Sequence, residues 1–204
     1  MSDTEHDSRR PDSGESGPVP DWDDEYFDRV SDRLMNNYDL EKDRRVAGER
    51  FDLYGHLRIE NQKQFLHPSI NFANHHVHEH LLATRLDGVA RRDLERLVDL
   101  GHELAGEWIE ADEEHQGTDF TFVVVTDDVP DEVRSFVAGF SDRTLLRYGF
   151  HGHYELNLGV VAPDREDAVA SEHADVVRAF TLWDDAAPTE SPGLLSRLVS
   201  RLRG

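Results

Sequence analysis

The run Phe120-Thr-Phe-Val-Val-Val125 decides the fold, because it is a nearly continuous apolar segment that lies between Asp119 and the pair Asp127-Asp128. A strand-forming run of this kind is typical of a strand that is buried on both faces. The sequence therefore predicts a sheet with this strand in its interior, and the patterns on either side predict the elements that surround it.

Two periods of hydrophobic spacing alternate along the chain on either side of this run. A period of two predicts strands over residues 51–60 and 74–86, and residues 144–150 and 153–161 are predicted to form a hairpin around Gly152. A spacing of three to four predicts helices over residues 23–38, 94–109, 130–140 and 165–174, and polar residues 110–119 are expected to form a loop. Residues 176–183 fit either period, and their β-branched and aromatic content favours a strand.

These elements predict an α+β fold, in which one layered domain over residues 21–183 has a mostly antiparallel sheet covered by helices. Residues 1–20 are polar and rich in proline, so we expect a disordered acidic leader. Residues 184–192 are predicted to be a linker, and residues 193–204 a short, basic amphipathic helix.

The charge balance excludes several classes of partner. The chain of 204 residues has 43 acidic and 22 basic residues and a formal net charge of −21, and only Lys42 and Lys63 are lysines. An acidic surface with so little lysine is typical of proteins that stay soluble in concentrated salt, where charges are screened. We therefore expect a cytoplasmic haloarchaeal protein with no nucleic-acid partner.

The sequence has no transmembrane segment, and its lack of cysteine excludes disulfides and thiolate chemistry.

Histidine is the residue type that offers the most candidate ligands and catalytic groups, with 12 copies in the chain. Alternate side chains of a strand share a face, so His76, His78 and His80 are expected to project together. If a neighbouring strand carries His153, that imidazole joins them, and Glu155 on the same face as His153 offers a further ligand or a base. A His-x-His pair with a third histidine or carboxylate is a common way to hold zinc, iron or copper.

The sequence therefore predicts a site for a divalent transition metal such as zinc at His76, His78, His80 and His153. His56, which has Asp52 and Glu60 on its own strand face, is a further source of a ligand or of a supporting carboxylate. The alternative is that these imidazoles are half-exposed residues of the sheet that hydrogen-bond to carboxylates in a very acidic protein.

The string His76-Val-His-Glu-His-Leu-Leu82 also resembles the signature of the histidine-triad nucleotide hydrolases and transferases, in which three histidines alternate with hydrophobic residues. This resemblance implies that His78 is a catalytic nucleophile that attacks a phosphate, while His76 and His80 orient the phosphate and the leaving group. Glu79 departs from the signature, because a hydrophobic residue belongs at that position.

Two further hypotheses concern other parts of the chain. Asp52, Glu60 and Lys63 faintly resemble the magnesium-binding set of restriction nucleases, but the last spacing is one residue too long and the acidic chain offers no basic channel for DNA. The C-terminal segment suggests a non-enzymatic adaptor that docks on a protein partner or a membrane surface. The predicted contact residues are Leu194, Leu195, Arg197, Leu198, Arg201 and Leu202.

Over residues 22–183 the chain resembles an uncharacterised haloarchaeal family of unknown function. The resemblance lies in Phe51-Asp-Leu-Tyr-Gly-His-Leu-Arg-Ile-Glu-Asn61 and Asn74-His-His-Val-His-Glu-His80. It implies a habitat and a single domain, and it implies no activity.

Overall fold

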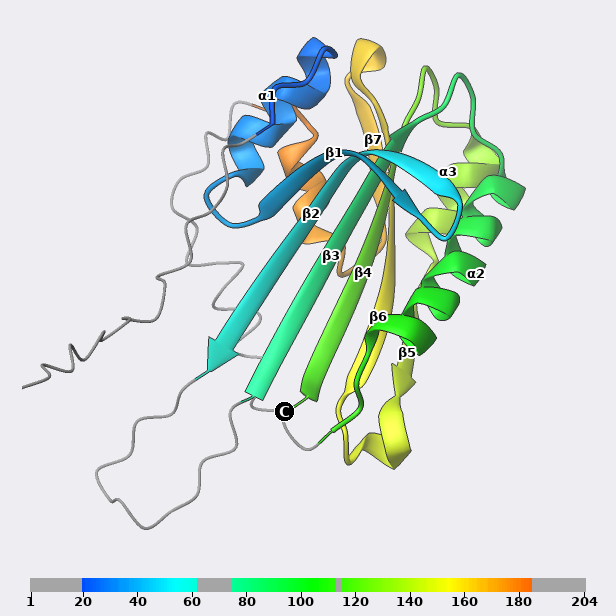
Figure 1. Cartoon of the computed structure of the whole chain (residues 1–204). Helices are drawn as coiled ribbons and strands as arrows, with labels where there is room; N and C mark the ends of the chain where they lie inside the picture. The colour runs from blue at the N-terminus through cyan, green and yellow to red at the C-terminus, as the bar shows by residue number, and fades with distance from the viewer. Residues whose placement is uncertain (1–19, 62–74, 113–114, 185–204) are drawn as a thin grey trace, which may run out of the picture.

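The computed structural model describes residues 20–61, 75–112 and 115–184. These residues form one α+β domain, in which a seven-stranded mixed sheet has helices on both faces, so the predicted fold class is confirmed (Figure 1). The strands are β1 (Asp39–Val46), β2 (Glu49–Asn61), β3 (His75–Arg85), β4 (His115–Val125), β5 (Asp142–Leu145), β6 (His153–Ala162) and β7 (Asp167–Ala170). The α-helices are α1 (Glu25–Leu34), α2 (Arg91–Trp108) and α3 (Asp131–Ala138), and the 3-10 helices are η1 (Leu146–Gly149), η2 (Pro163–Arg165) and η3 (Asp175–Ala179).

The centre of the sheet is parallel and its flanks are antiparallel. The strand order is β1-β2-β3-β4-β6-β5, and β7 also pairs with β6. β3, β4 and β6 run parallel to one another, whereas β1–β2, β2–β3, β5–β6 and β6–β7 are antiparallel pairs. Parallel neighbours need a crossover connection, which α2 provides between β3 and β4. The expectation of a mostly antiparallel sheet therefore holds for the flanks and is wrong for the centre.

Two hydrophobic cores lie on opposite faces of this sheet, because successive residues of a strand point to opposite sides. On one face, Leu94 and Leu104 of α2 belong to the same buried cluster as Phe122 of β4. On the other face, Phe27 of α1 belongs to a cluster with Val123, the next residue of β4. A strand that supplies both cores must be apolar throughout, which is why the run over residues 120–125 identifies the centre of the sheet.

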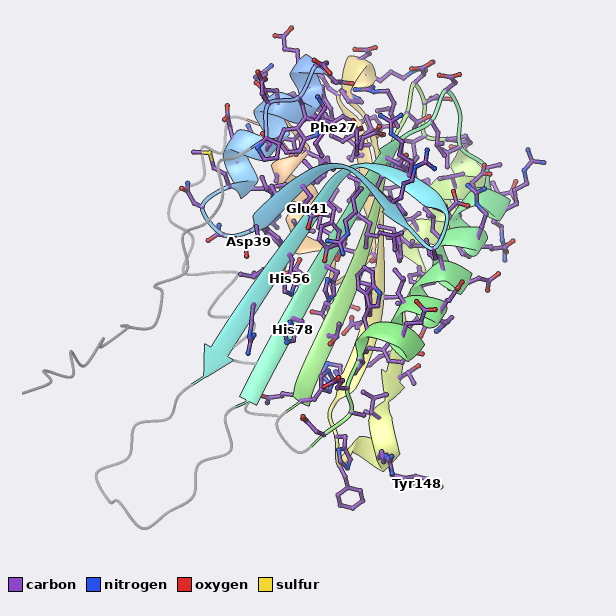
Figure 2. The ribbon with its side chains drawn as sticks, in the orientation of Figure 1. Phe27, Asp39, Glu41, His56, His78 and Tyr148 are labelled. Atoms are coloured by element: carbon purple, nitrogen blue, oxygen red, sulfur yellow. The ribbon has the colours of Figure 1, made fainter. Side chains whose placement is uncertain are left out.

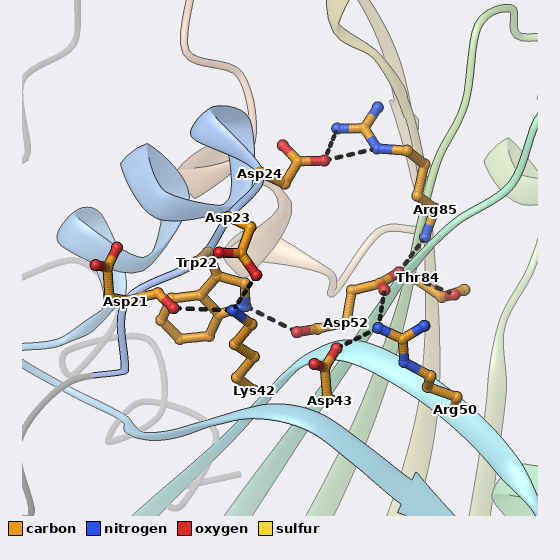
Figure 3. A network of polar contacts seen from close by, with 10 residues as sticks. All are labelled: Asp21, Trp22, Asp23, Asp24, Lys42, Asp43, Arg50, Asp52, Thr84 and Arg85. Carbon is orange, nitrogen blue, oxygen red and sulfur yellow. Dashed lines mark hydrogen bonds and ion pairs between the residues drawn. The ribbon is translucent and has the colours of Figure 1, made fainter.

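The segment before α1 is fastened to β2 and β3 by polar contacts (Figure 3). The indole of Trp22 donates a hydrogen bond to the carbonyl oxygen of Asp52 over 2.8 Å. Asp24 caps the first turn of α1 and forms an ion pair of 2.8 Å with Arg85. The carboxylate of Asp52 accepts the backbone N–H of Arg85 over 2.8 Å, so Asp52 braces two strands. The side chains of Glu60 and Lys63, its predicted partners in a nuclease-like set, lie outside the described residues.

Two predictions for the end of the domain are wrong. Residues 165–174, predicted as a helix, contain strand β7, which pairs with β6 at the edge of the sheet. Residues 176–183, predicted as a strand, begin within η3. Val177 of η3 packs so closely on Gly159 of β6 that a Cβ atom at Gly159 would lie 2.4 Å from it. The apolar residues of the segment 176–183 cover the sheet, and a covering segment can have its apolar residues at either spacing.

Other differences concern where elements begin and end. The first helix ends at Leu34, and β1, which the sequence pattern did not predict, starts at Asp39. β4 begins at His115, inside the segment that was expected to be a loop, and β5 is followed by η1 instead of continuing to residue 150. The predicted leader, linker and C-terminal helix fall almost wholly in residues 1–19 and 185–204, outside the described part of the chain. Within the described ranges, no helix is long and apolar enough to cross a lipid bilayer.

Phe122 and Phe150 allow a direct test of where the core lies, because Phe122 is fully buried and Phe150 is 84% exposed. We expect Phe122→Ala to lower the free energy of unfolding by about 3 to 5 kcal/mol, since it leaves a cavity between β4 and α2. The matched variant Phe150→Ala should change it by less than about 0.5 kcal/mol. Urea unfolding followed by circular dichroism measures both, and equal losses would contradict this placement of the core.

Candidate metal centre

The two faces of the sheet carry different chemistry near the starts of β4 and β6. Residues that pair directly across neighbouring strands project their side chains on the same face. His80 of β3 pairs with Phe120 of β4, on the face that α2 covers. Glu79 pairs with Asp119, and Asp119 pairs in turn with Glu155 of β6, so these three carboxylates lie on the opposite face. His80 therefore lies on one face, and the carboxylates of Glu79, Asp119 and Glu155 lie on the other.

A row of three imidazoles, which we call the histidine row, consists of His56, His78 and His80. The ring of His56 lies parallel to both of the others, with centroids 5.3 Å from His78 and 4.7 Å from His80. Nε2 of His56 and Nδ1 of His78 are 3.0 Å apart, which is a hydrogen-bond distance. Figure 2 shows these two rings on β2 and β3. The row exists because β2 and β3 are antiparallel neighbours, with His56 directly opposite His80.

His80 is the buried end of the histidine row and is only 9% exposed. The hydroxyl of Tyr54 lies 2.8 Å from its Nδ1, and its ring packs beside Trp108 at the end of α2. Burial, followed by the neighbouring imidazoles and Arg44, lowers the pKa of His80 to about 3. Burial also lowers the pKa of His56. Both rings are therefore neutral at neutral pH.

The opposite face holds a compact set of potential metal ligands, which we call the metal group: Asp119 of β4 with His153 and Glu155 of β6. One ligand atom from each of these residues lies within 4.8 Å of those of the other two. Asp119 and His153 are half-buried, and Glu155 is 4% exposed. Among the described residues, these form the one group of three or more potential ligands whose donor atoms lie this close together.

Two glycines allow His153 to take its place in the metal group. Gly152 has φ +75°, and a Cβ atom there would lie 2.2 Å from the carbonyl oxygen of Gln116, so only glycine permits the chain to pass so close to β4. Gly117 pairs with His153, and a Cβ atom at Gly117 would lie 3.2 Å from the imidazole. The ring therefore occupies the space that a side chain at position 117 would take.

Neighbouring groups hold the carboxylate and the imidazole of β6. Nδ1 of His173, which lies between β7 and η3, is hydrogen-bonded to Oε1 of Glu155. Arg143 of β5 pairs with Glu155 in the sheet register, and its guanidinium lies 3.4 Å from Nδ1 of His153. Both β6 side chains of the metal group are thus oriented by residues from other elements.

Glu79 of β3 places a further carboxylate on this face, one strand beyond Asp119. Tyr38 is hydrogen-bonded to Glu79, and burial, followed by the charge and the hydrogen bond of Glu79, raises the pKa of Tyr38 well above its ordinary value. The hydroxyl therefore stays protonated and donates to the carboxylate. Glu79 lies beside Asp119 but is not one of the three residues of the metal group.

The donor set of the metal group suits a borderline divalent cation. One imidazole nitrogen with carboxylate oxygens is typical of zinc, manganese and iron sites, with bonds of about 2.0 to 2.2 Å. Ligands of one ion at these bond lengths lie about 3.0 to 3.5 Å from one another, so donor atoms that now lie within 4.8 Å must approach by about 1 Å when an ion binds. Three protein ligands leave coordination positions for water or for another oxygen ligand.

The structure does not bring the four histidines predicted as ligands to one place. His153 lies in the metal group, whereas His78 and His80 lie on the other face of the sheet, with β4 between their strand and that of His153. The side chain of His76 lies outside the described residues, and so do all six residues predicted to contact a partner or a membrane within residues 193–204.

Sequence reasoning singled out His153 and Glu155 but not Asp119 or His173. Asp119 was assigned to a loop and His173 to a helix, and neither residue stands in a motif. Only the parallel register of β4 with β6 brings Asp119 beside Glu155. The signal that was available is the pair Gly117 and Gly152, since glycines flanking a histidine-bearing strand indicate a close approach of backbones.

The neutral state of His80 predicts a pH dependence of stability. A histidine with a pKa of about 3 in the folded chain and about 6.5 in the unfolded chain makes its full contribution to the free energy of unfolding above pH 6.5. Its contribution is lost as the pH falls towards 3, because the unfolded chain takes up the proton first. Relative to His80→Gln, the native sequence should lose about 2 to 3 kcal/mol of unfolding free energy between pH 7 and 4.5.

Urea unfolding of both chains at the two pH values measures this difference. His102→Gln on α2 is the control, because the side chain of His102 is 39% exposed. A difference between native chain and His80→Gln that stays constant with pH would contradict a buried, neutral His80.

Comparison with known proteins supplies a family but no activity. No curated protein and no solved structure matches the chain at a significant level. A family model described as "Domain of unknown function (DUF8052)" matches residues 23–182, which span the sheet, its helices, the histidine row and the metal group. The chain therefore belongs to the DUF8052 family of domains of unknown function.

Proposed function

We propose that this domain binds a divalent transition metal such as zinc through Asp119, His153 and Glu155. The observation that carries the proposal is the convergence of one imidazole and two carboxylates from two parallel strands, with ligand atoms within 4.8 Å of one another. The proposal keeps His153 from the sequence prediction and replaces the other predicted ligands with the carboxylates beside it.

The burial of Glu155 supports a cation at this place. A carboxylate that is 4% exposed has lost most of its hydration, which is costly unless partners compensate for it. His173 provides one partner through Nδ1. Hydrogen bonds between histidines and carboxylates commonly orient the ligands of metal sites, and a divalent cation would balance the charge of Asp119 and Glu155 together.

The ligand number favours a reactive site over a purely structural one. Structural zinc sites are closed by four protein ligands, whereas three ligands leave positions for water or a substrate oxygen. A bound divalent metal would lower the pKa of such a water and would polarise a carbonyl or phosphoryl oxygen. Arg143, beside His153, would supply a positive charge for an anionic substrate group at this edge of the sheet.

Zinc titration of the chelator-treated chain, purified without a His-tag, tests the proposal by calorimetry. We expect a binding event that Asp119→Asn and His153→Ala each weaken by at least about 100-fold, because each removes a ligand. His173→Gln should weaken it by about 10- to 100-fold, since it only orients Glu155.

The matched control is His102→Asn, which removes a histidine from α2, outside both the metal group and the histidine row, and should leave this binding event unchanged. If Asp119→Asn and His153→Ala bind zinc as tightly as the native chain, the metal group is not the site and the proposal is wrong.

Gly117→Ala provides a second test that removes no ligand. The new Cβ atom would lie 3.2 Å from the imidazole of His153, so the ring must shift from its observed position. We expect zinc affinity to fall by about 10-fold, an effect of the size produced by disturbing the support of a ligand. The control is Gly106→Ala on α2, where a Cβ atom meets nothing within 4 Å. Unchanged zinc affinity in Gly117→Ala would argue that His153 does not act from its observed position.

We also propose that the domain works in a medium of high salt, as its net charge of −21 suggests. Self-repulsion of such a surface is screened when the Debye length falls to about 3 Å at 1 M salt. The midpoint of thermal unfolding should therefore rise with KCl concentration, and a midpoint that falls would contradict the proposal.

A further inference from the structure

The histidine row lies on the face of the sheet opposite to the metal group, and the proposed function does not use it. Two of its members, His56 and His78, are half-buried and come from neighbouring antiparallel strands. Their nearest nitrogens, Nε2 of His56 and Nδ1 of His78, are 3.0 Å apart. We propose that His56 and His78 chelate a second divalent cation of the copper, nickel and zinc group, independently of the metal group.

The spacing of the two nitrogens supports chelation. With metal–nitrogen bonds of about 2.0 to 2.1 Å, two ligands at right angles lie about 2.9 Å apart, and two tetrahedral ligands about 3.4 Å apart. The distance of 3.0 Å falls in this range, so the backbone need not move. Only the rings must turn, so that both lone pairs point to one ion in place of the shared proton.

The surroundings hold the His56 ring in place. It lies at 7° to the ring of His80, with centroids 4.7 Å apart, and His80 is fixed in turn by the hydroxyl of Tyr54. Asp39 of β1 pairs directly with His56, and its negative charge acts on that imidazole. Burial favours the neutral form of His56, which is the form that binds metals.

The ligand chemistry selects the class of cation. Two imidazole nitrogens, with water at the remaining positions, favour copper and nickel over the harder cations that carboxylate-rich sites accept. Strand pairing holds the two backbones in place before the ion arrives, so binding costs only the turning of the two rings. The two faces of one sheet would then hold cations of different preference.

Copper(II) is the probe for this site. The titration uses the full chain with Asp119→Asn and His153→Ala, so that the metal group cannot contribute. In this background we expect one equivalent of copper(II), with an electron paramagnetic resonance spectrum that shows two nitrogen donors. Adding His56→Asn or His78→Asn should lower the affinity by at least about 10-fold and leave one nitrogen donor.

The control adds His102→Asn, which removes an imidazole from α2 and should leave the affinity and the spectrum unchanged. Copper should also raise the unfolding midpoint of the background chain, because only the folded sheet holds the two rings together. Equal affinity in the His56→Asn, His78→Asn and His102→Asn chains, or no rise in the midpoint, would show adventitious binding only and overturn the inference. Because the metal group is inactive in every chain, this outcome would leave the proposed function untouched.

Discussion

The parallel pairing of β4 with β6 holds the centre of the sheet and the metal group together. It places Asp119 beside Glu155 and Gly117 beside His153, so the metal group exists only in this register. A shift by one residue would turn Asp119 towards α2 and bury its carboxylate among apolar side chains. The apolar residues 120–125, which supply both hydrophobic cores, prevent such a shift, since every second side chain must reach its own core. The same packing that stabilises the fold therefore fixes the geometry of the metal group.

Strand alternation also explains why the two groups of polar residues remain separate. On β3, His80 points to one face and Glu79 to the other, and the same division continues into β4 and β6. One face consequently carries three parallel imidazoles, of which the innermost is kept neutral by burial. The other face carries carboxylates with a single imidazole from β6. A domain built this way can offer nitrogen-rich and oxygen-rich ligand sets on opposite sides of one sheet.

The sequence predicted the parts of the fold that local patterns determine. Continuous apolar character identified the central strand at 120–125, alternation identified β2 and β3, and helical spacing identified α2. It missed the parallel centre, because nothing local distinguishes a crossover helix from one that caps an antiparallel sheet. His153 was therefore expected beside His78 and His80, whereas β4 lies between their strands. Asp119 was assigned to a loop because its role depends on pairing with Glu155, which lies 36 positions later in the chain.

Anomalous scattering can show directly whether Asp119, His153 and Glu155 hold one cation. Crystals of the chain grown with zinc, measured on both sides of the zinc absorption edge, locate the metal without reference to affinity or stability. We expect an anomalous peak about 2.0 to 2.2 Å from a carboxylate oxygen of Asp119, a carboxylate oxygen of Glu155 and a ring nitrogen of His153. Zinc-bound crystals with no peak at these three side chains would contradict it.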